Sequence, residues 1–270
     1  MKKINADLLS LIVIAAFSFM FATAIHEHGG HALACVLQGG HISEMGAFYV
    51  DCTRTSLSEF GNRVVAVAGP LVSFLTGLIA LGYFYRNQRT DASLTFFLWH
   101  FATVNLMMAS GYFLFSGVAG IGDLGTGESG AFQGVQPEWL IRMGLSVLGL
   151  VFYYAVIRIS IKMMDHFIGG EGRERVGRAQ MLSVIAYLVG GGIAILIGLF
   201  NPYGIVIVLV SSFASSMGGT SGMAWMMQLL DRSKDTGMPA FAMPRNWSWI
   251  FVGVGFILLY AIIFGRTLYL

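Results

Sequence analysis

Charged residues are scarce in this sequence: Asp, Glu, Lys and Arg make up 11% of its 270 residues, whereas soluble domains carry about 25%. So few charges cannot cover a surface that faces water, but a surface that faces lipid needs none. The formal net charge is only +2, and the chain has no basic block or RNA-binding aromatic motif, so we expect no nucleic-acid partner. These absences predict an integral membrane protein surrounded by the lipid bilayer.

Cysteine is equally scarce. Cys35 and Cys52 are the only two, and they do not form a CxxC pair, which argues against a zinc site built from thiolates. The two cysteines could form a disulfide if both face an oxidising compartment. They could equally be two unrelated thiols.

Long uncharged apolar stretches are present instead, and they predict an all-α polytopic membrane protein with about seven transmembrane helices, since one crossing needs about 20 apolar residues. The stretch 179–230 carries no charge and is too long for one pass. Asn201-Pro202 is its natural break, because proline cannot continue a helix. The predicted spans are residues 8–25, 64–85, 92–122, 139–161, two passes within 179–230, and 247–265.

A strong chemical signal lies at the end of the first span, where residues 26–31 read HEHGGH. Ionisable side chains at membrane depth are costly and usually functional. The ordinary alternative is a set of histidines at the water interface that make common hydrogen bonds. On a regular helix Glu27, His28 and His31 fall within an arc of about 100°, as the residues of an H-E-x-x-H zinc motif do. In that alignment the first two roles are swapped: Glu27 stands where the first histidine ligand belongs and His28 where the base belongs, and His28 lies on the metal face as a candidate ligand.

A second alignment keeps the usual order of the motif. His26 and His31 are five residues apart, so on a regular helix they cannot share a metal, but a single π-bulge adds one residue to a turn and brings them together. Gly29-Gly30 weakens the helix at that point, which makes the distortion less costly. We prefer this alignment, with His26 as a ligand and Glu27 as the base.

A catalytic zinc takes three protein ligands and leaves one position open, so a third ligand must come from elsewhere in the chain. Asp123 is the best candidate, because it follows the third span in the glycine-rich stretch 117–125. The third span runs parallel to the first, so both end on the same side of the membrane. Asp123 could otherwise be an ordinary loop carboxylate.

These features resemble the site-2 protease family of intramembrane zinc metalloproteases. HEHGGHALA, which starts at His26, is similar to the family's H-E-x-x-H-A motif with one extra residue. Residues 68–71 (AGPL) are similar to its glycine-proline motif. Asn105 and Asp123 resemble the asparagine and the metal-binding aspartate of its third core helix. The resemblance implies a metal-binding core in residues 1–135, whereas the helices of 136–270 have no assigned role.

The resemblance also implies a bound Zn²⁺ and hydrolysis of peptide bonds in a membrane protein or peptide. His26, His31 and Asp123 would be the ligands and Glu27 the general base. Asn105 would hold the substrate or the oxyanion. Residues 41–52 (HISEMGAFYVDC) could form a β-hairpin that binds an extended substrate by strand addition, or they could be a loop.

Two other classes of function compete with the protease. One is a non-catalytic membrane protein of the same fold that binds metal or acts as a scaffold. The other is a metal transporter that uses the histidines as a transit site, but polar residues are sparse in the later spans. His100 is a lone histidine within a span, and we expect it to form a hydrogen bond between helices.

Lys and Arg in the short loops predict the orientation, because these residues favour the cytoplasmic side. With a cytoplasmic N-terminus, twelve of the 16 Lys and Arg lie inside and four lie outside. We therefore expect a multi-pass protein of a bacterial inner membrane.

Reporter fusions after Arg89, within 117–138 and after Arg175 should report inside, outside and inside. The opposite pattern would overturn this orientation and put the histidine cluster in the cytoplasm.

Overall fold

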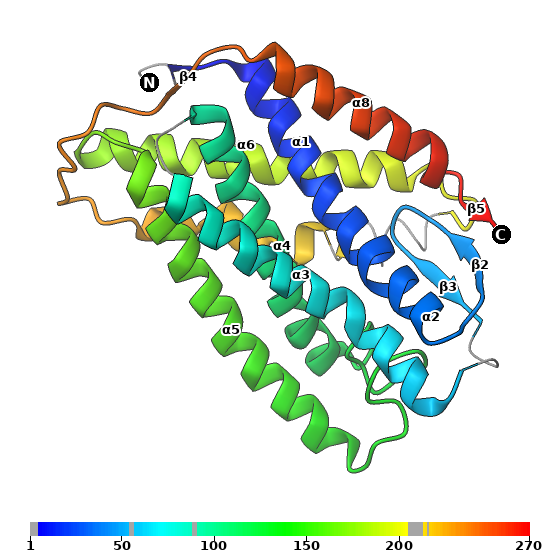
Figure 1. The fold of residues 1–270 in the computed structure, drawn as a ribbon. Coiled ribbons are helices and arrows are strands. Elements are labelled where there is room, and N and C mark those ends of the chain that lie inside the picture. The colour runs from blue at the N-terminus through cyan, green and yellow to red at the C-terminus, as the bar shows by residue number, and fades with distance from the viewer. Residues whose placement is uncertain (1–4, 54–56, 88–90, 205–212, 215) are drawn as a thin grey trace.

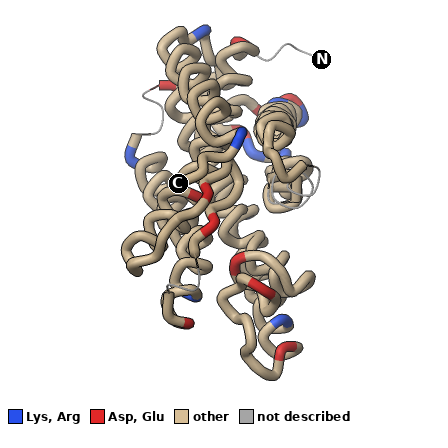
Figure 2. The backbone as a smooth tube through the Cα atoms, turned by 90° about the vertical axis from the view of Figure 1, so that its right-hand side faces the viewer, with Lys and Arg blue, Asp and Glu red and all other residues tan. Residues whose placement is uncertain are grey.

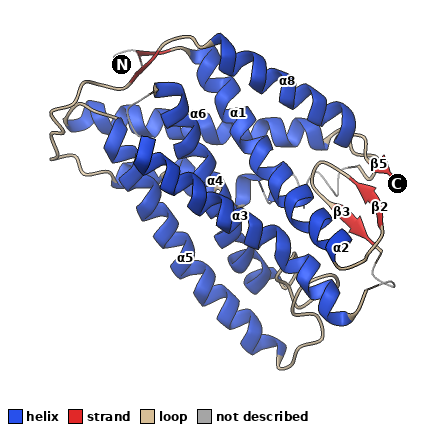
Figure 3. Cartoon of the chain, viewed as in Figure 1, coloured by secondary structure: helices blue, strands red, loops and turns tan. Residues whose placement is uncertain are grey.

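The chain is a bundle of long helices with a small sheet at one end (Figures 1 and 3). Our computed structural model describes residues 5–53, 57–87, 91–204, 213–214 and 216–270. In these ranges the long helices are α1 (Leu8–Ala24), α3 (Glu59–Asn87), α4 (Ala92–Ala119), α5 (Glu138–Phe167), α6 (Gly172–Gly198) and α8 (Trp247–Phe264). The π-helix η1 (Ile25–Ala32) and the short helix α2 (Leu33–Leu37) continue α1 without a break.

Six of the described helical stretches are long and apolar enough to cross a membrane. They are the continuous stretch Leu8–Leu37 together with α3, α4, α5, α6 and α8. Large apolar side chains are exposed along their outer faces, among them Val147 and Val151 of α5 and Phe251 and Ile262 of α8. Figure 2 shows long stretches of backbone without a charged residue. This surface suits lipid, and the six helices indicate a multi-pass membrane protein.

The seventh predicted span is not confirmed. Helix α6 ends at Gly198, just before the predicted break at Asn201-Pro202. Beyond it, residues 205–212 and 215 lie outside the described part of the chain. Of the described residues that follow up to 229, 213–214 and 216–218 are π-helical, and two short 3₁₀ helices come next, η4 (Ser221–Ala224) and η5 (Met226–Leu229). Glycine and serine are frequent here, and both residue types weaken a helix.

Helix α4 is the centre of the bundle. It packs against α1, α3 and α5, and Phe96, Trp99 and Met107 are fully buried. The predicted interhelical hydrogen bond of His100 is present, because its Nδ1 contacts the Ser18 hydroxyl of α1. The ends of α1 and α4 therefore keep a fixed relation to each other.

The small sheet closes the end of the bundle that carries the histidine cluster. Strand β2 (Ile42–Met45) pairs antiparallel with β3 (Val50–Cys52) and, on its other edge, with β5 (Leu268–Tyr269). Cys35 of α2 and Cys52 of β3 form a disulfide, so the first of the two interpretations of these cysteines is correct. The two halves of the chain are in contact, because α8 packs on α1.

At the opposite end, β1 (Asn5–Ala6) pairs in parallel with β4 (Ala242–Met243). This pairing places the start of α1 beside the start of α8. Asp7 caps α1 by accepting a hydrogen bond from the Ser10 amide and also pairs with Arg245. The two helices therefore enter the bundle side by side.

Candidate metal centre

The histidine cluster lies on a turn of π-helix, as the preferred alignment predicts. In η1 the i→i+5 hydrogen bonds widen each turn by about one residue, so residues five apart stack on one side. His26 Nε2 and His31 Nε2 are 3.3 Å apart. Both side chains are buried. The extra residue of HEHGGH is thus accommodated inside the helix, and the two histidines meet as they would in H-E-x-x-H.

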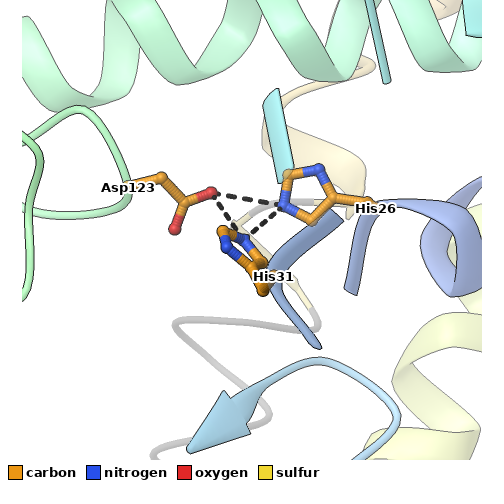
Figure 4. A group of neighbouring side chains, drawn as sticks. All are labelled: His26, His31 and Asp123. Atoms are coloured by element: carbon orange, nitrogen blue, oxygen red, sulfur yellow. Dashed lines mark hydrogen bonds and ion pairs between the residues drawn. The ribbon is translucent and has the colours of Figure 1, made fainter. Parts of the chain in front are cut away.

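Asp123 reaches the same point from the loop after α4 (Figure 4). Its Oδ2 lies 3.2 Å from His26 Nε2 and 3.3 Å from His31 Nε2, so the three atoms form a nearly equilateral triangle. Ligand atoms about 2.0–2.1 Å from a tetrahedral zinc are separated by about 3.3–3.4 Å. The triangle therefore has the edge length that a tetrahedral site requires, and this buried group could hold a metal ion.

Hydrogen bonds from α3 orient both imidazole rings. His31 Nδ1 lies 2.8 Å from the Val65 carbonyl oxygen. A carbonyl can only accept, so Nδ1 carries the proton, and the neutral ring has a free lone pair at Nε2. His26 Nδ1 lies 3.0 Å from the Ser73 hydroxyl. Partners of this kind behind metal-bound histidines fix the ring and the tautomer.

The charge state of the Asp123 carboxyl depends on the two rings that face it. Burial raises the pKa of this carboxyl, but His31 and His26, when protonated, outweigh this effect and hold the pKa well below its usual range. Asp123 Oδ2 has no hydrogen bond of good geometry from a described residue. The oxygen and the His31 lone pair thus point at the same space, which a cation would fill favourably. An imidazolium–carboxylate ion pair is the metal-free alternative.

Glu27 lies beside this group without belonging to it. Its side chain is 7% exposed and lines a cavity of about 1080 Å³ together with His31 and Asp123. It is close enough to interact electrostatically with His26, His31 and Asp123, yet no described residue gives it a hydrogen bond. A buried carboxylate without a partner is costly, which suggests that a reacting molecule provides the partner.

His28 points away from the metal group, so its assignment as a candidate ligand is corrected. Its Nε2 lies 3.3 Å from the Tyr260 hydroxyl, and its ring stacks on Phe264 with centroids 4.2 Å apart. The π-turn brings His26 rather than His28 next to His31. His28 instead joins η1 to α8, and Tyr260 extends the connection by donating to the Ala47 carbonyl oxygen at 2.7 Å.

The structure places Asn105 outside the cavity that holds the metal group. Asn105 is 0% exposed, its amide nitrogen donates to the Phe101 carbonyl of its own helix, and it is not among the residues that line the cavity. Tyr112, two turns further along α4, does line the cavity. The Tyr112 ring stacks on His26 with centroids 4.9 Å apart and planes at 10°.

A close approach between helix backbones places the ligands. A Cβ atom on Gly30 would lie 2.6 Å from the Gly69 Cα, and a Cβ on Gly69 would lie 2.3 Å from His31 Nε2 and 2.7 Å from His26 Nε2. The glycine of the AGPL motif therefore leaves open the space beside the ligand atoms. Pro70 follows it within α3.

Comparison with family models, curated proteins and solved structures gives no match to this chain. The assignment of a function therefore depends on the geometry of the site.

Exchange of Gly69 for alanine should abolish tight metal binding, because the new methyl group would collide with both ligand nitrogens. Gly82→Ala is the matched control on α3, since a Cβ there has no neighbour within 4 Å. We expect Gly69→Ala to lower zinc affinity by more than the roughly 10- to 100-fold lost with a hydrogen-bond partner behind a ligand. Zinc content and chelator competition measure this. Wild-type affinity in Gly69→Ala would show that the metal does not lie here.

Proposed function

We propose that this chain is an intramembrane zinc metalloendopeptidase that hydrolyses peptide bonds of membrane-embedded substrates. The observation that carries the proposal is the triangle of His26, His31 and Asp123, with tetrahedral spacing, beside the unpartnered carboxylate of Glu27 in one cavity. A zinc ion held there would polarise the scissile carbonyl and lower the pKa of the attacking water.

Glu27 would act as the general base. It takes the proton from the water as the oxygen attacks the carbonyl carbon, and it delivers that proton to the amide nitrogen as the C–N bond breaks. Its burial, its place in the cavity and its lack of a hydrogen-bond partner among the described residues all suit this role. In the regular-helix alignment Glu27 would be a ligand instead, but the π-turn puts His26 in that position.

Strand β3 is a suitable place for the substrate backbone. It is an edge strand of the sheet, and Val50, Asp51 and Cys52 line the cavity that holds the metal group. An extended peptide could pair with this edge and leave its scissile bond facing Glu27. The peptide would first have to unwind locally, because a transmembrane helix has no free backbone groups to pair.

The disulfide supports the orientation that the Lys and Arg distribution predicts. Disulfides persist in oxidising compartments and are rare in the cytosol. The Cys35–Cys52 bond lies at the same end of the molecule as the metal group, because it joins the end of the first helical stretch to β3. We therefore propose that the site opens on the extracytoplasmic side of a bacterial inner membrane and that the N-terminus is cytoplasmic.

The catalytic role of Glu27 can be separated from metal binding. Glu27→Gln preserves the size of the side chain and should keep zinc, but it should reduce cleavage of a membrane-tethered peptide by about 10²- to 10⁴-fold, the usual contribution of a general base. Single-turnover cleavage in liposomes, with zinc measured on the same samples, provides the test. Glu59→Gln, an exposed carboxylate at the start of α3, is the control and should cleave normally.

Two outcomes would contradict the proposal. Cleavage by Glu27→Gln at the wild-type rate would exclude Glu27 as the base. A wild-type protein that holds zinc but cleaves no peptide across a broad set of membrane substrates would favour the non-catalytic metal-binding alternative.

A further inference from the structure

Peptide hydrolysis creates a negative charge on the carbonyl oxygen, and enzymes stabilise that oxyanion with fixed hydrogen-bond donors. Asn105, the residue that the sequence suggests for this role, is buried outside the cavity and donates to its own helix. A side-chain donor that adds to the polarisation by the metal would therefore have to come from another residue that lines the cavity.

Several described side chains that line the cavity carry an N–H or O–H group, but most are engaged or distant from the ligands. The Tyr203 hydroxyl and the Tyr49 hydroxyl donate to Glu44 near the sheet. The Tyr153 hydroxyl accepts from the Gly222 amide. Tyr112 differs from these because its ring is in contact with a ligand of the metal group.

The Tyr112 ring is held next to His26, a proposed ligand of the metal. It lies parallel to the His26 ring, and Ser73 holds that imidazole from the other side. Tyr112 lines the same cavity as Glu27 and Asp123, and its hydroxyl approaches the Asp123 carboxylate. A carbonyl held between the metal group and Glu27 would thus find a phenol O–H beside it.

We propose that Tyr112 is the oxyanion-binding residue of this enzyme, an inference that rests on the proposed function. Its O–H donates to the carbonyl oxygen as the new C–O bond forms and the C=O π electrons move onto that oxygen. Glu27 holds the proton taken from water and passes it to the leaving nitrogen. The C=O bond then reforms as the C–N bond breaks, and Tyr112 keeps its own proton throughout.

Tyr112→Phe removes the hydroxyl and preserves the ring that stacks on His26. Loss of one such donor costs about 10²- to 10³-fold in kcat, and we expect that loss with little change in KM or zinc content. Asn105→Ala should retain a larger share of wild-type kcat than Tyr112→Phe. Asn62→Ala tests another donor that lines the cavity and should cleave with wild-type kcat.

A second measurement does not depend on turnover. A phosphinic peptide carries a tetrahedral anionic group that resembles the oxyanion, so zinc-loaded Tyr112→Phe should bind it about 10²- to 10³-fold more weakly than wild type. Its affinity for a peptide of the same sequence that resists cleavage should be unchanged. Competition binding in detergent measures both affinities.

The outcomes separate this inference from the proposed function. If wild type cleaves and Tyr112→Phe matches it in kcat and in phosphinic-peptide affinity, Tyr112 is not the donor, while the protease proposal stands. Loss of zinc in Tyr112→Phe would make it a positioning residue for Asp123 and overturn the inference. A large loss of kcat in Asn62→Ala alone would assign the role to Asn62. If zinc-loaded wild type neither cleaves peptides nor binds the phosphinic peptide, both proposals fail.

Discussion

The contact between the backbones of η1 and α3 at Gly30 and Gly69 is the constraint on which the site depends. Because neither residue has a side chain, the π-turn lies directly against α3. The same contact brings His31 within hydrogen-bond distance of the Val65 carbonyl and His26 within reach of Ser73. One close approach therefore sets the position and the rotation of both histidine rings and the tautomer of His31.

A second constraint is the cost of charge at membrane depth. The loop after α4 turns back at Gly120 and Gly122, both with positive φ, a conformation that glycine adopts without strain. The turn brings the Asp123 carboxylate to the two imidazole nitrogens. An isolated buried carboxylate would be costly, so a cation bound there would stabilise both the site and the loop that carries Asp123. Metal binding and local folding would then be coupled.

Much of this arrangement could be predicted from the sequence, because it follows from counting residues. A spacing of five between His26 and His31 requires a π-turn if they share a metal, and the structure has one. The parallel course of the first and third spans predicts that Asp123 joins them. In contrast, α4 is apolar on all sides, so no periodicity shows which face meets the histidines, and nothing in the sequence singles out Tyr112. The seventh span is predicted from low charge and length alone, and it includes residues 205–212 and 215, which lie outside the described part of the chain.

The central claim is that the π-turn selects His26 and His31 as metal ligands and turns His28 away. The zinc content of purified wild type, His26→Ala and His28→Ala tests it directly. We predict one zinc ion per chain in wild type and in His28→Ala, and its loss in His26→Ala, because two ligands hold zinc far more weakly than three. Retention of zinc in His26→Ala together with its loss in His28→Ala would contradict the account.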